Sequence, residues 1–187
     1  MAANSIFEKL SRLFGYPDGE YATRAAGCFN RLALEDSKAA GPFAEFCAGL
    51  QGLGTEELQE LYTRTFDLNP MCTLEVGWQL FGEDYQRGEF LVKMRQQLRA
   101  HTLPESQELP DHLTHVLAML GRLEADEAAE FAAQYLLPAL EKMNAAWKED
   151  RNAFASLLTS TFLLVKNRFP TPFASLPVRR PELRVLN

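Results

Sequence analysis

Two histidines three residues apart are the side chains in this sequence best suited to metal or proton chemistry. His112 and His115 would share one face of a helix, and Asp111 stands beside them. Imidazole nitrogens and a carboxylate can bind Zn²⁺ or exchange protons near neutral pH. A metal site needs three or four ligands, however, and no other cluster supplies them. The pattern therefore favours a hydrogen-bonded histidine pair at the start of a helix over a metal centre.

The cysteines do not add a metal or redox site to this pair. Cys28, Cys47 and Cys72 are widely spaced, and the sequence contains no Cys-x-x-Cys pair. Zinc sites and dithiol redox sites usually depend on such close pairs. We therefore expect buried, reduced thiols of the kind found in cytosolic proteins, and no bound metal.

Neighbouring carboxylates could supply acid-base chemistry, but their positions favour another role. Glu56–Glu57 and Glu83–Asp84 stand where helices are expected to start, and a helix N-terminus attracts negative charge. The nucleotide-binding patterns GxGxxG and GxxxxGK(S/T) are absent, as are the hydrolase GxSxG and the metalloprotease HExxH. The sequence therefore predicts a protein that is not an enzyme and has no cofactor of its own.

Composition and charge limit the class of protein and of partner. The chain has 187 residues, of which 47% are apolar, and a formal net charge of -6, which suits one acidic globular domain. Phosphate binding needs basic patches, so nucleic acid is disfavoured as a partner, whereas a basic peptide is compatible. Apolar runs of membrane-spanning or signal-peptide type are absent, so we expect a cytoplasmic protein without stable membrane insertion.

The elements that would position these residues are all predicted to be helices, because apolar residues recur at helical spacing. Ile6, Leu10, Leu13 and Phe14, for example, share one helical face. Convincing period-two alternation, which would indicate strands, is absent. The predicted helices cover residues 6–14, 20–34, 42–50, 55–66, 73–81, 84–100, 110–120, 126–147 and 154–169.

Individual residues predict where several of these helices start or break. We expect Pro42 in a first helical turn, Thr55 and Thr73 as N-caps, and Pro110–Asp111 at the opening of a helix. Pro138 should kink its long helix or split it in two, because proline lacks the backbone N–H that the helix needs.

The domain organisation follows from this pattern. We expect an all-α fold, a single-domain helical bundle of about eight to ten helices that covers residues 1–169. Residues 170–187 contain four prolines and should form an extended C-terminal tail.

Four stretches are more specific than generic helices. They read Leu-Ser-Arg-Leu-Phe-Gly-Tyr-Pro at 10–17, Leu-Tyr-Thr-Arg-Thr-Phe-Asp at 61–67, Trp-Gln-Leu-Phe-Gly-Glu-Asp-Tyr-Gln-Arg-Gly at 78–88 and Glu-Leu-Pro-Asp-His-Leu at 108–113. In this order and spacing they resemble the TorD/DmsD/NarJ-like redox enzyme maturation proteins, which are chaperones of molybdopterin-containing reductases. The resemblance covers roughly residues 5–169.

Two details favour one branch of that family. The trimethylamine N-oxide and dimethyl sulfoxide reductase branches share Glu-Pro-x-Asp-His, whereas residues 108–112 read Glu-Leu-Pro-Asp-His. Residues 66–70 read Phe-Asp-Leu-Asn-Pro, which is similar to the nitrate reductase branch. The chain therefore most resembles nitrate reductase assembly chaperones, while reductases or dehydrogenases for other substrates stay open as clients.

The resemblance implies a complete functional picture. Such proteins are all-helical and non-catalytic, and they bind the N-terminal segment of a catalytic subunit, which is a twin-arginine leader or its remnant. Binding keeps this client open for insertion of molybdopterin guanine dinucleotide and can delay export or assembly. The client carries the cofactor, and the chaperone is a monomer or a dimer. A general helical adaptor that binds another partner helix is the alternative, and an enzyme built on the histidine pair comes third.

The client-binding residues expected from this resemblance form an aromatic group and a polar group. The aromatic group offers contact area at low entropic cost, although side chains at helical spacing are often core. The polar group would hold a basic segment, although Asp111 could instead cap a helix and Arg87 could pair with Glu83 or Asp84. The candidates are Tyr62, Phe66, Trp78, Phe81, Glu83, Tyr85, Arg87, Glu108, Asp111, His112 and His115.

Two further expectations concern charge. Acidic residues could form a rim around an apolar groove, and they are Asp67, Glu75, Glu83, Asp84, Glu108 and Asp111. In the tail, Phe173 and Leu176 precede Val178-Arg179-Arg180-Pro181, a combination that could occupy the chaperone's own groove when no client is bound.

Overall fold

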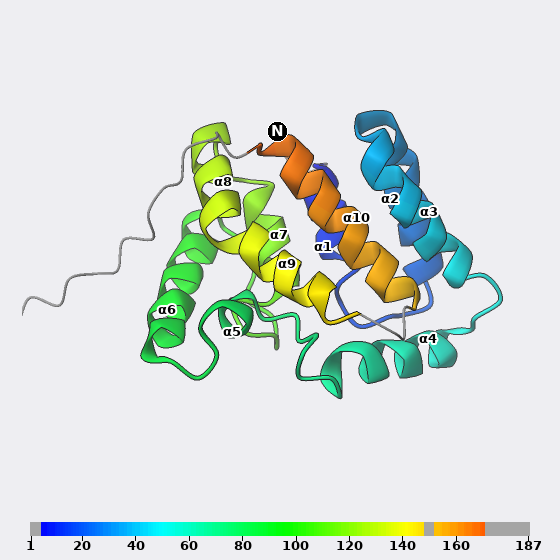
Figure 1. The fold of residues 1–187 in the computed structure, drawn as a ribbon, viewed down its shortest axis with the longest axis horizontal. Helices are drawn as coiled ribbons and strands as arrows, with labels where there is room; N and C mark the ends of the chain where they lie inside the picture. Colours follow the sequence, from blue (N-terminus) through cyan, green and yellow to red (C-terminus); the bar gives the residue numbers. More distant parts are fainter. Residues whose placement is uncertain (1–4, 148–151, 171–187) are drawn as a thin grey trace, which may run out of the picture.

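Helices make up the regular structure of the described chain, as the sequence predicts. The computed structural model describes residues 5–147 and 152–170, within which the only β-type pairing is one isolated bridge between Glu75 and His112. Figure 1 shows the helices in order. They are α1 Ile6–Ser11, α2 Tyr21–Glu35, α3 Ser37–Gly49, α4 Thr55–Tyr62, the π-helix η1 Thr63–Asp67, α5 Val76–Phe81, α6 Tyr85–Ala100, α7 Leu113–Leu120, α8 Ala125–Phe131, the π-helix η2 Ala132–Leu136, α9 Leu137–Ala145 and α10 Ala153–Arg168.

The helices form two groups that share one core. Helix α10 packs along α3, and α2 packs on α3, at the right of Figure 1. Helices α5 to α9 form the other group at the left, and the contacts of α1 with α7 and of α9 with α10 join the two. Buried apolar side chains form one continuous cluster through both groups. This arrangement confirms the all-α prediction, while the predicted tail from residue 171 onward lies outside the described residues.

Asp36 decides where α3 begins, and the expected start at Pro42 was wrong. The Asp36 carboxylate accepts hydrogen bonds from the backbone N–H groups of Lys38 and Ala39. A side-chain acceptor at this position satisfies N–H groups that the first turn cannot pair internally. The helix therefore starts at Ser37, and Pro42 lies inside it.

The two threonines expected as N-caps do not occupy that position. Gly54 precedes α4, and its N–H donates to Glu57 Oε2 at 2.8 Å, so Thr55 is already helical. Glu75, not Thr73, precedes α5. In both cases a backbone N–H group at the helix start has another hydrogen-bond partner. The preference for threonine at N-caps does not reveal such a partner.

The proline-containing stretch is divided as its sequence suggests. Helix α8 passes into η2, and α9 then carries Pro138 near its start. A π-helical turn displaces the hydrogen-bond ladder by one residue, which accommodates a missing N–H. Trp147, expected inside this stretch, lies beyond the end of α9. None of the helices described is long and apolar enough to cross a membrane.

Candidate functional site

Asp111 is the buried centre of the polar residues that the sequence singled out. Its side chain is 0% exposed, and Oδ2 accepts the Gly77 N–H at 3.1 Å. Its carbonyl accepts the Val76 N–H at 2.9 Å, and the Leu113 N–H donates to the Leu74 carbonyl at 2.9 Å. The segment before α7 is therefore tied to the start of α5. The expectation that Pro110–Asp111 opens α7 was wrong, because these two residues lie in a turn in which the His112 N–H donates to the Leu109 carbonyl at 2.9 Å, and His112 caps the helix.

Gly77 allows this close approach. A Cβ atom at residue 77 would lie 2.7 Å from Asp111 Oδ2 and 2.9 Å from Phe90 Cδ1, which leaves no room for a side chain. Sequence reasoning did not select Gly77. Its only local signal is a glycine inside a short apolar helix, where glycine is otherwise unfavourable.

Arg87 completes this group, which we call the Asp111 junction: buried Gly77 and Asp111 with partly buried Trp78 and Arg87. Arg87 Nε lies 3.7 Å from Asp111 Oδ2, and the guanidinium lies 5.2 Å from the Trp78 ring centroid. Burial raises the pKa of Asp111, and the Arg87 charge opposes this shift. Within the described chain, Asp111 Oδ1 and Arg87 Nε have no hydrogen-bond partner. Arg87 thus pairs with Asp111 and not with Glu83 or Asp84.

The two histidines do not converge on a shared ligand. His112 is the N-cap of α7, and its Nδ1 lies 2.8 Å from Thr114 Oγ1. Burial lowers the pKa of His112 to about 4, so the ring is neutral at pH 7. His115 Nε2 lies 3.0 Å from Ser106 Oγ, a contact that anchors the loop before α7. In residues 5–147 and 152–170, no group of three His, Cys, Asp or Glu side chains could hold a metal ion.

Three of the expected rim carboxylates come together from three separate segments. Asp67 ends η1, Glu75 precedes α5 and Glu108 belongs to the loop before α7. Burial raises the pKa of Glu108, and the charges of Glu75 and Asp67 raise it further. The same three carboxylates also raise the pKa of buried Tyr62, after the larger effect of its burial. No lysine or arginine of the described chain forms an ion pair with them.

Exposed apolar side chains come from the same segments as these carboxylates. Leu68 is 73% exposed, Met71 67% and Leu109 44%. Tyr16, from the turn after α1, is also exposed, and its ring meets the Tyr62 ring edge-on at 5.5 Å. Sequence reasoning missed these four residues because exposure has no local signature. We use the name acidic face for the three carboxylates, the exposed apolar residues of their segments and Tyr16, which are Tyr16, Asp67, Leu68, Met71, Glu75, Glu108 and Leu109.

The expected aromatic group is divided between core and surface. Tyr62 and Phe66 are buried, and their rings pack against Phe154 at 5.6 and 5.2 Å. They belong to the hydrophobic core of the described chain. Trp78 and Phe81 are partly buried.

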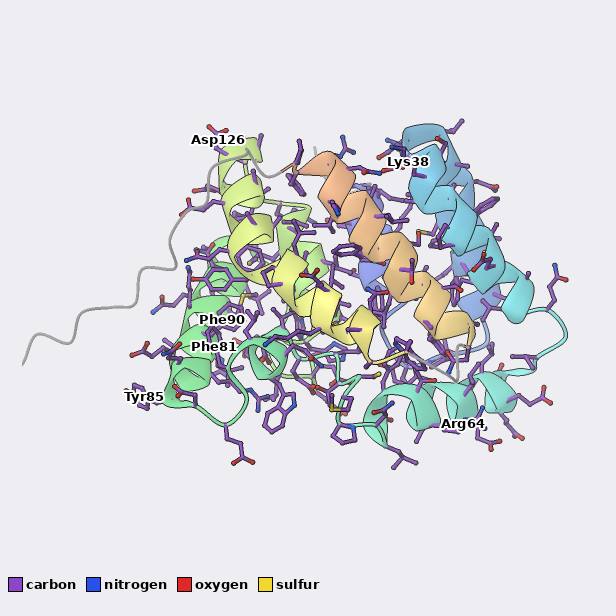
Figure 2. The ribbon with its side chains drawn as sticks, viewed as in Figure 1. Lys38, Arg64, Phe81, Tyr85, Phe90 and Asp126 are labelled. Carbon is purple, nitrogen blue, oxygen red and sulfur yellow. The ribbon has the colours of Figure 1, made fainter. Side chains whose placement is uncertain are left out.

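Tyr85 and Glu83 lie at the start of α6, apart from the core aromatics. Figure 2 shows Phe81 near Phe90, at a centroid distance of 5.8 Å, while Tyr85 points outward. Tyr85 is 82% exposed, and Glu83 is also exposed. In the described chain, no hydrogen bond, ion pair or ring contact joins either residue to the acidic face.

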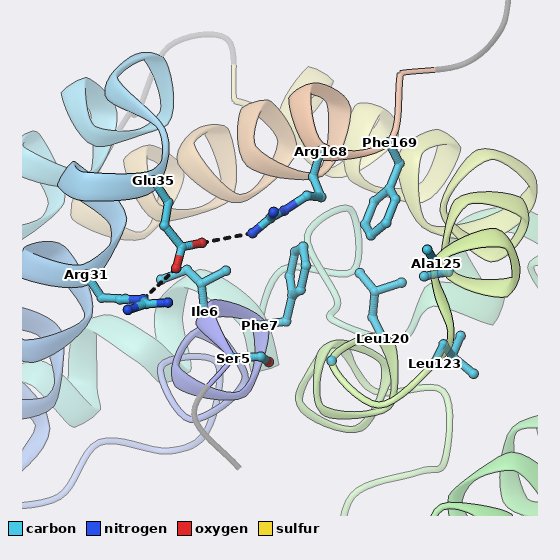
Figure 3. Close-up of a pocket in the computed structure, with 12 residues that line it drawn as sticks. Ser5, Ile6, Phe7, Arg31, Glu35, Leu120, Leu123, Ala125, Arg168 and Phe169 are labelled. Atoms are coloured by element: carbon cyan, nitrogen blue, oxygen red, sulfur yellow. Dashed lines mark hydrogen bonds and ion pairs between the residues drawn. The ribbon is translucent and has the colours of Figure 1, made fainter. Parts of the chain in front are cut away.

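The hollows on the described surface include one near the acidic face and one at the other side of the core. One of about 520 Å³ is lined by Met71 of the acidic face together with Gln79, Lys142, Ala145 and Ala146. The other, of about 350 Å³, lies between α1, the α7–α8 connection and the end of α10 (Figure 3). There the rings of Phe7 and Phe169 stack at 5.8 Å, and Glu35 binds Arg31 and Arg168 at the rim. None of the expected site residues lines this second hollow.

Comparison with known proteins places this arrangement in a family. The model of the nitrate reductase delta subunit family matches residues 30–175, which include the Asp111 junction and all of the acidic face except Tyr16. The chain belongs to the nitrate reductase delta subunit family. This membership confirms the resemblance to the nitrate reductase branch.

Two proteins similar to this chain have names that describe their role. They are the nitrate reductase molybdenum cofactor assembly chaperones NarJ of Escherichia coli K12 and of Escherichia coli O157:H7. Each is 29% identical to this chain over 155 residues, which cover 79% of this chain and 64% of the relative. The match therefore spans less than two thirds of the length of these relatives.

Proposed function

We propose that this protein is a cytoplasmic molybdenum cofactor assembly chaperone for a nitrate reductase-type enzyme. It binds the N-terminal segment of the catalytic subunit and holds that subunit open until molybdopterin guanine dinucleotide is inserted, before export or assembly. The client carries the cofactor, and the chaperone catalyses no reaction. Membership of the nitrate reductase delta subunit family and the role stated in the names of two relatives support this proposal.

The acidic face is the observation that carries the binding step. Three carboxylates stand close together without a basic partner in the described chain, so their mutual repulsion is uncompensated. A basic segment would relieve this repulsion, and opposite charge would also speed the encounter. Leu68, Met71 and Leu109 supply apolar contact area for the rest of the segment. An N-terminal segment that combines basic and apolar residues fits this composition.

The Asp111 junction positions this face and does not contact the client. Asp111 ties the segment before α7 to the start of α5, so it holds Glu108 and Glu75 at a set separation. Fully buried Asp111 and nearly buried His112 are therefore positioning residues. His115 adds to this through Ser106, whose Oγ also accepts the Glu108 N–H at 3.1 Å.

Removal of the three charges tests this function. A synthetic peptide of the client's N-terminal segment is titrated into the full-length chain and into its Asp67→Asn/Glu75→Gln/Glu108→Gln variant. We expect roughly ten- to hundredfold weaker binding and a weaker salt dependence in the variant. The matched control is Glu124→Gln/Glu127→Gln/Glu130→Gln, which removes three exposed charges on or beside α8.

The outcomes separate the proposal from the adaptor alternative. Binding of the client peptide that the control variant retains and the acidic-face variant loses supports the proposal. Equal binding by both variants would show that the acidic face is not the site. Equally tight binding of unrelated amphipathic helices would favour a general helical adaptor.

A further inference from the structure

We propose that the hollow beside the acidic face receives one bulky apolar side chain of the client segment, within one helical turn of a basic residue held by the carboxylates. The hollow is lined by Met71, Gln79, Lys142, Ala145 and Ala146. This inference rests on the proposed function and deepens it, because it states which side chains the client must present and how far apart they stand.

Small residues create the space. Ala145 ends α9 and Ala146 follows it, and neither has a side chain beyond Cβ. The hollow measures about 520 Å³, within the range of roughly 300–1,000 Å³ that is typical of ligand pockets. Met71 forms an exposed wall, and the unbranched thioether of methionine adapts to the shape of its partner. The site can therefore accept a large aliphatic or aromatic side chain.

Hydrogen bonds between the lining residues set the shape of the hollow in advance. The Gln79 side-chain amide donates to the carbonyls of Met71 and Thr73 at 3.2 and 3.0 Å. Lys142 Nζ donates to the Gln79 carbonyl at 2.7 Å. These bonds join α9, α5 and the loop that carries Met71. A pre-formed pocket loses less conformational entropy when its occupant binds.

Charge and spacing determine the orientation in which the client segment binds. The Lys142 ammonium repels a basic group from the hollow, whereas Glu75 and Asp67 attract one to the acidic face. Glu75 and Gln79 are one helical turn apart, since the Gln79 N–H donates to the Glu75 carbonyl at 3.1 Å. A helical client would span both places with side chains three or four residues apart. The occupant is thus an amphipathic segment with a basic and a bulky apolar residue at that spacing.

The test fills the hollow while the carboxylates stay in place. Binding of the client's N-terminal peptide, measured by fluorescence anisotropy, is compared for the full-length wild type, Ala146→Phe and Ala33→Phe. Ala33 is exposed on α2, so it controls for the added aromatic ring. We expect Ala146→Phe to weaken binding by at least about tenfold and Ala33→Phe to leave it unchanged. A second variant, Met71→Ala, removes an exposed wall that the core does not need and should weaken binding about threefold.

Peptide variants complete the test. Replacement of the bulky apolar residue of the peptide by alanine should weaken its binding to the wild type. It should weaken binding to Ala146→Phe little further, because that variant has already lost the same contact. Unchanged binding by Ala146→Phe and Met71→Ala, with wild-type binding intact, overturns the inference and leaves the proposed function standing. A wild type that binds neither the peptide nor the catalytic subunit overturns both. Self-association of the wild type that Ala146→Phe abolishes would assign the hollow to a second copy and also overturn the inference.

Discussion

The α3–α10 contact and the Asp111 junction both contain buried polar groups, which are hydrogen-bonded in the first region and only partly paired in the second. At α3–α10, Ser160 Oγ donates to the Ala39 carbonyl at 2.7 Å, and rings pack around Phe154. At the junction, Asp111 Oδ1 and Arg87 Nε are buried and have no hydrogen-bond partner in the described chain. Unpaired buried polar atoms lower stability. The first region therefore serves stability, whereas the second accepts a cost to position a surface.

The largest effect is expected in the region that serves stability. The Phe154 ring contacts four others, with centroid distances from 5.2 to 6.2 Å to Tyr21, Phe46, Tyr62 and Phe66. Phe154→Ala should lower the free energy of unfolding by about 3–5 kcal/mol, because it leaves a cavity among these rings. Urea denaturation followed by circular dichroism measures this loss. A smaller loss of unfolding free energy in Phe154→Ala than in Gly77→Ala, the junction variant described below, would reverse the comparison.

The second effect is a pH dependence of stability at His112, the N-cap of α7 next to the Asp111 junction. Burial lowers the pKa of His112 from 6.5 to about 4, so the unfolded chain binds more protons in this window. The contribution of neutral His112 to the free energy of unfolding is fully present above pH 6.5. It falls by up to ~3 kcal/mol as the pH drops to about 4. His112→Asn retains a capping acceptor and removes this titration, so the fall between pH 7 and pH 4 should become shallower.

Glu108 and Asp111 contribute to the same pH profile with the opposite sign. Their raised pKa values mean that the folded chain binds more protons than the unfolded chain above the ordinary carboxyl range. They are present in both the wild type and His112→Asn, so the difference between the two denaturation profiles isolates the histidine. Identical slopes would show that His112 titrates normally in the folded protein.

A pair of glycines sharpens the comparison further. Gly77→Ala places a methyl group against Asp111 and Phe90, and we expect it to destabilise the protein by about 1–3 kcal/mol and to weaken client binding. Gly27, on α2, has nothing within 4 Å of the position that a Cβ would take. Gly27→Ala should therefore stabilise the protein by about 0.5–1 kcal/mol without changing binding. Thermal unfolding and peptide titration of the two variants measure both quantities, and equal signs of the stability change would contradict the interpretation.

The smallest effect is expected for Glu108 on the acidic face, where stability and client binding should change in opposite directions. Glu108→Gln removes one of three mutually repelling charges, so it should stabilise the protein slightly, by about 0.5 kcal/mol at pH 7. The same change should weaken client binding, because it removes an acceptor for a basic group. The two opposite responses identify a residue kept for function. A variant that loses both stability and binding would instead show a structural role.

Local sequence patterns predicted the helices well and their starts less well. The range predicted from residue 84 to residue 100 matches α6, and that from 154 to 169 nearly matches α10, because apolar spacing of three to four residues is a local property. The start of α3 was placed too late, since Asp36 acts through two backbone bonds that the proline signal hid. Capping of α7 was the alternative role considered for Asp111, whereas its bond to Gly77 joins residues that are 34 positions apart.

The sequence by itself determined the all-α class, the membership of a chaperone family and the polar residues around which the site is built. Each of these depends on residue types and on their spacing along the chain, which can be read without knowing which helix faces pack together. The tertiary structure alone decided that Tyr62 and Phe66 are core, that Asp67, Glu75 and Glu108 share one surface, and that Tyr16 lies beside them. Burial and the meeting of distant charges depend on which helix faces pack together, and that choice is made by the whole chain and not by any one segment.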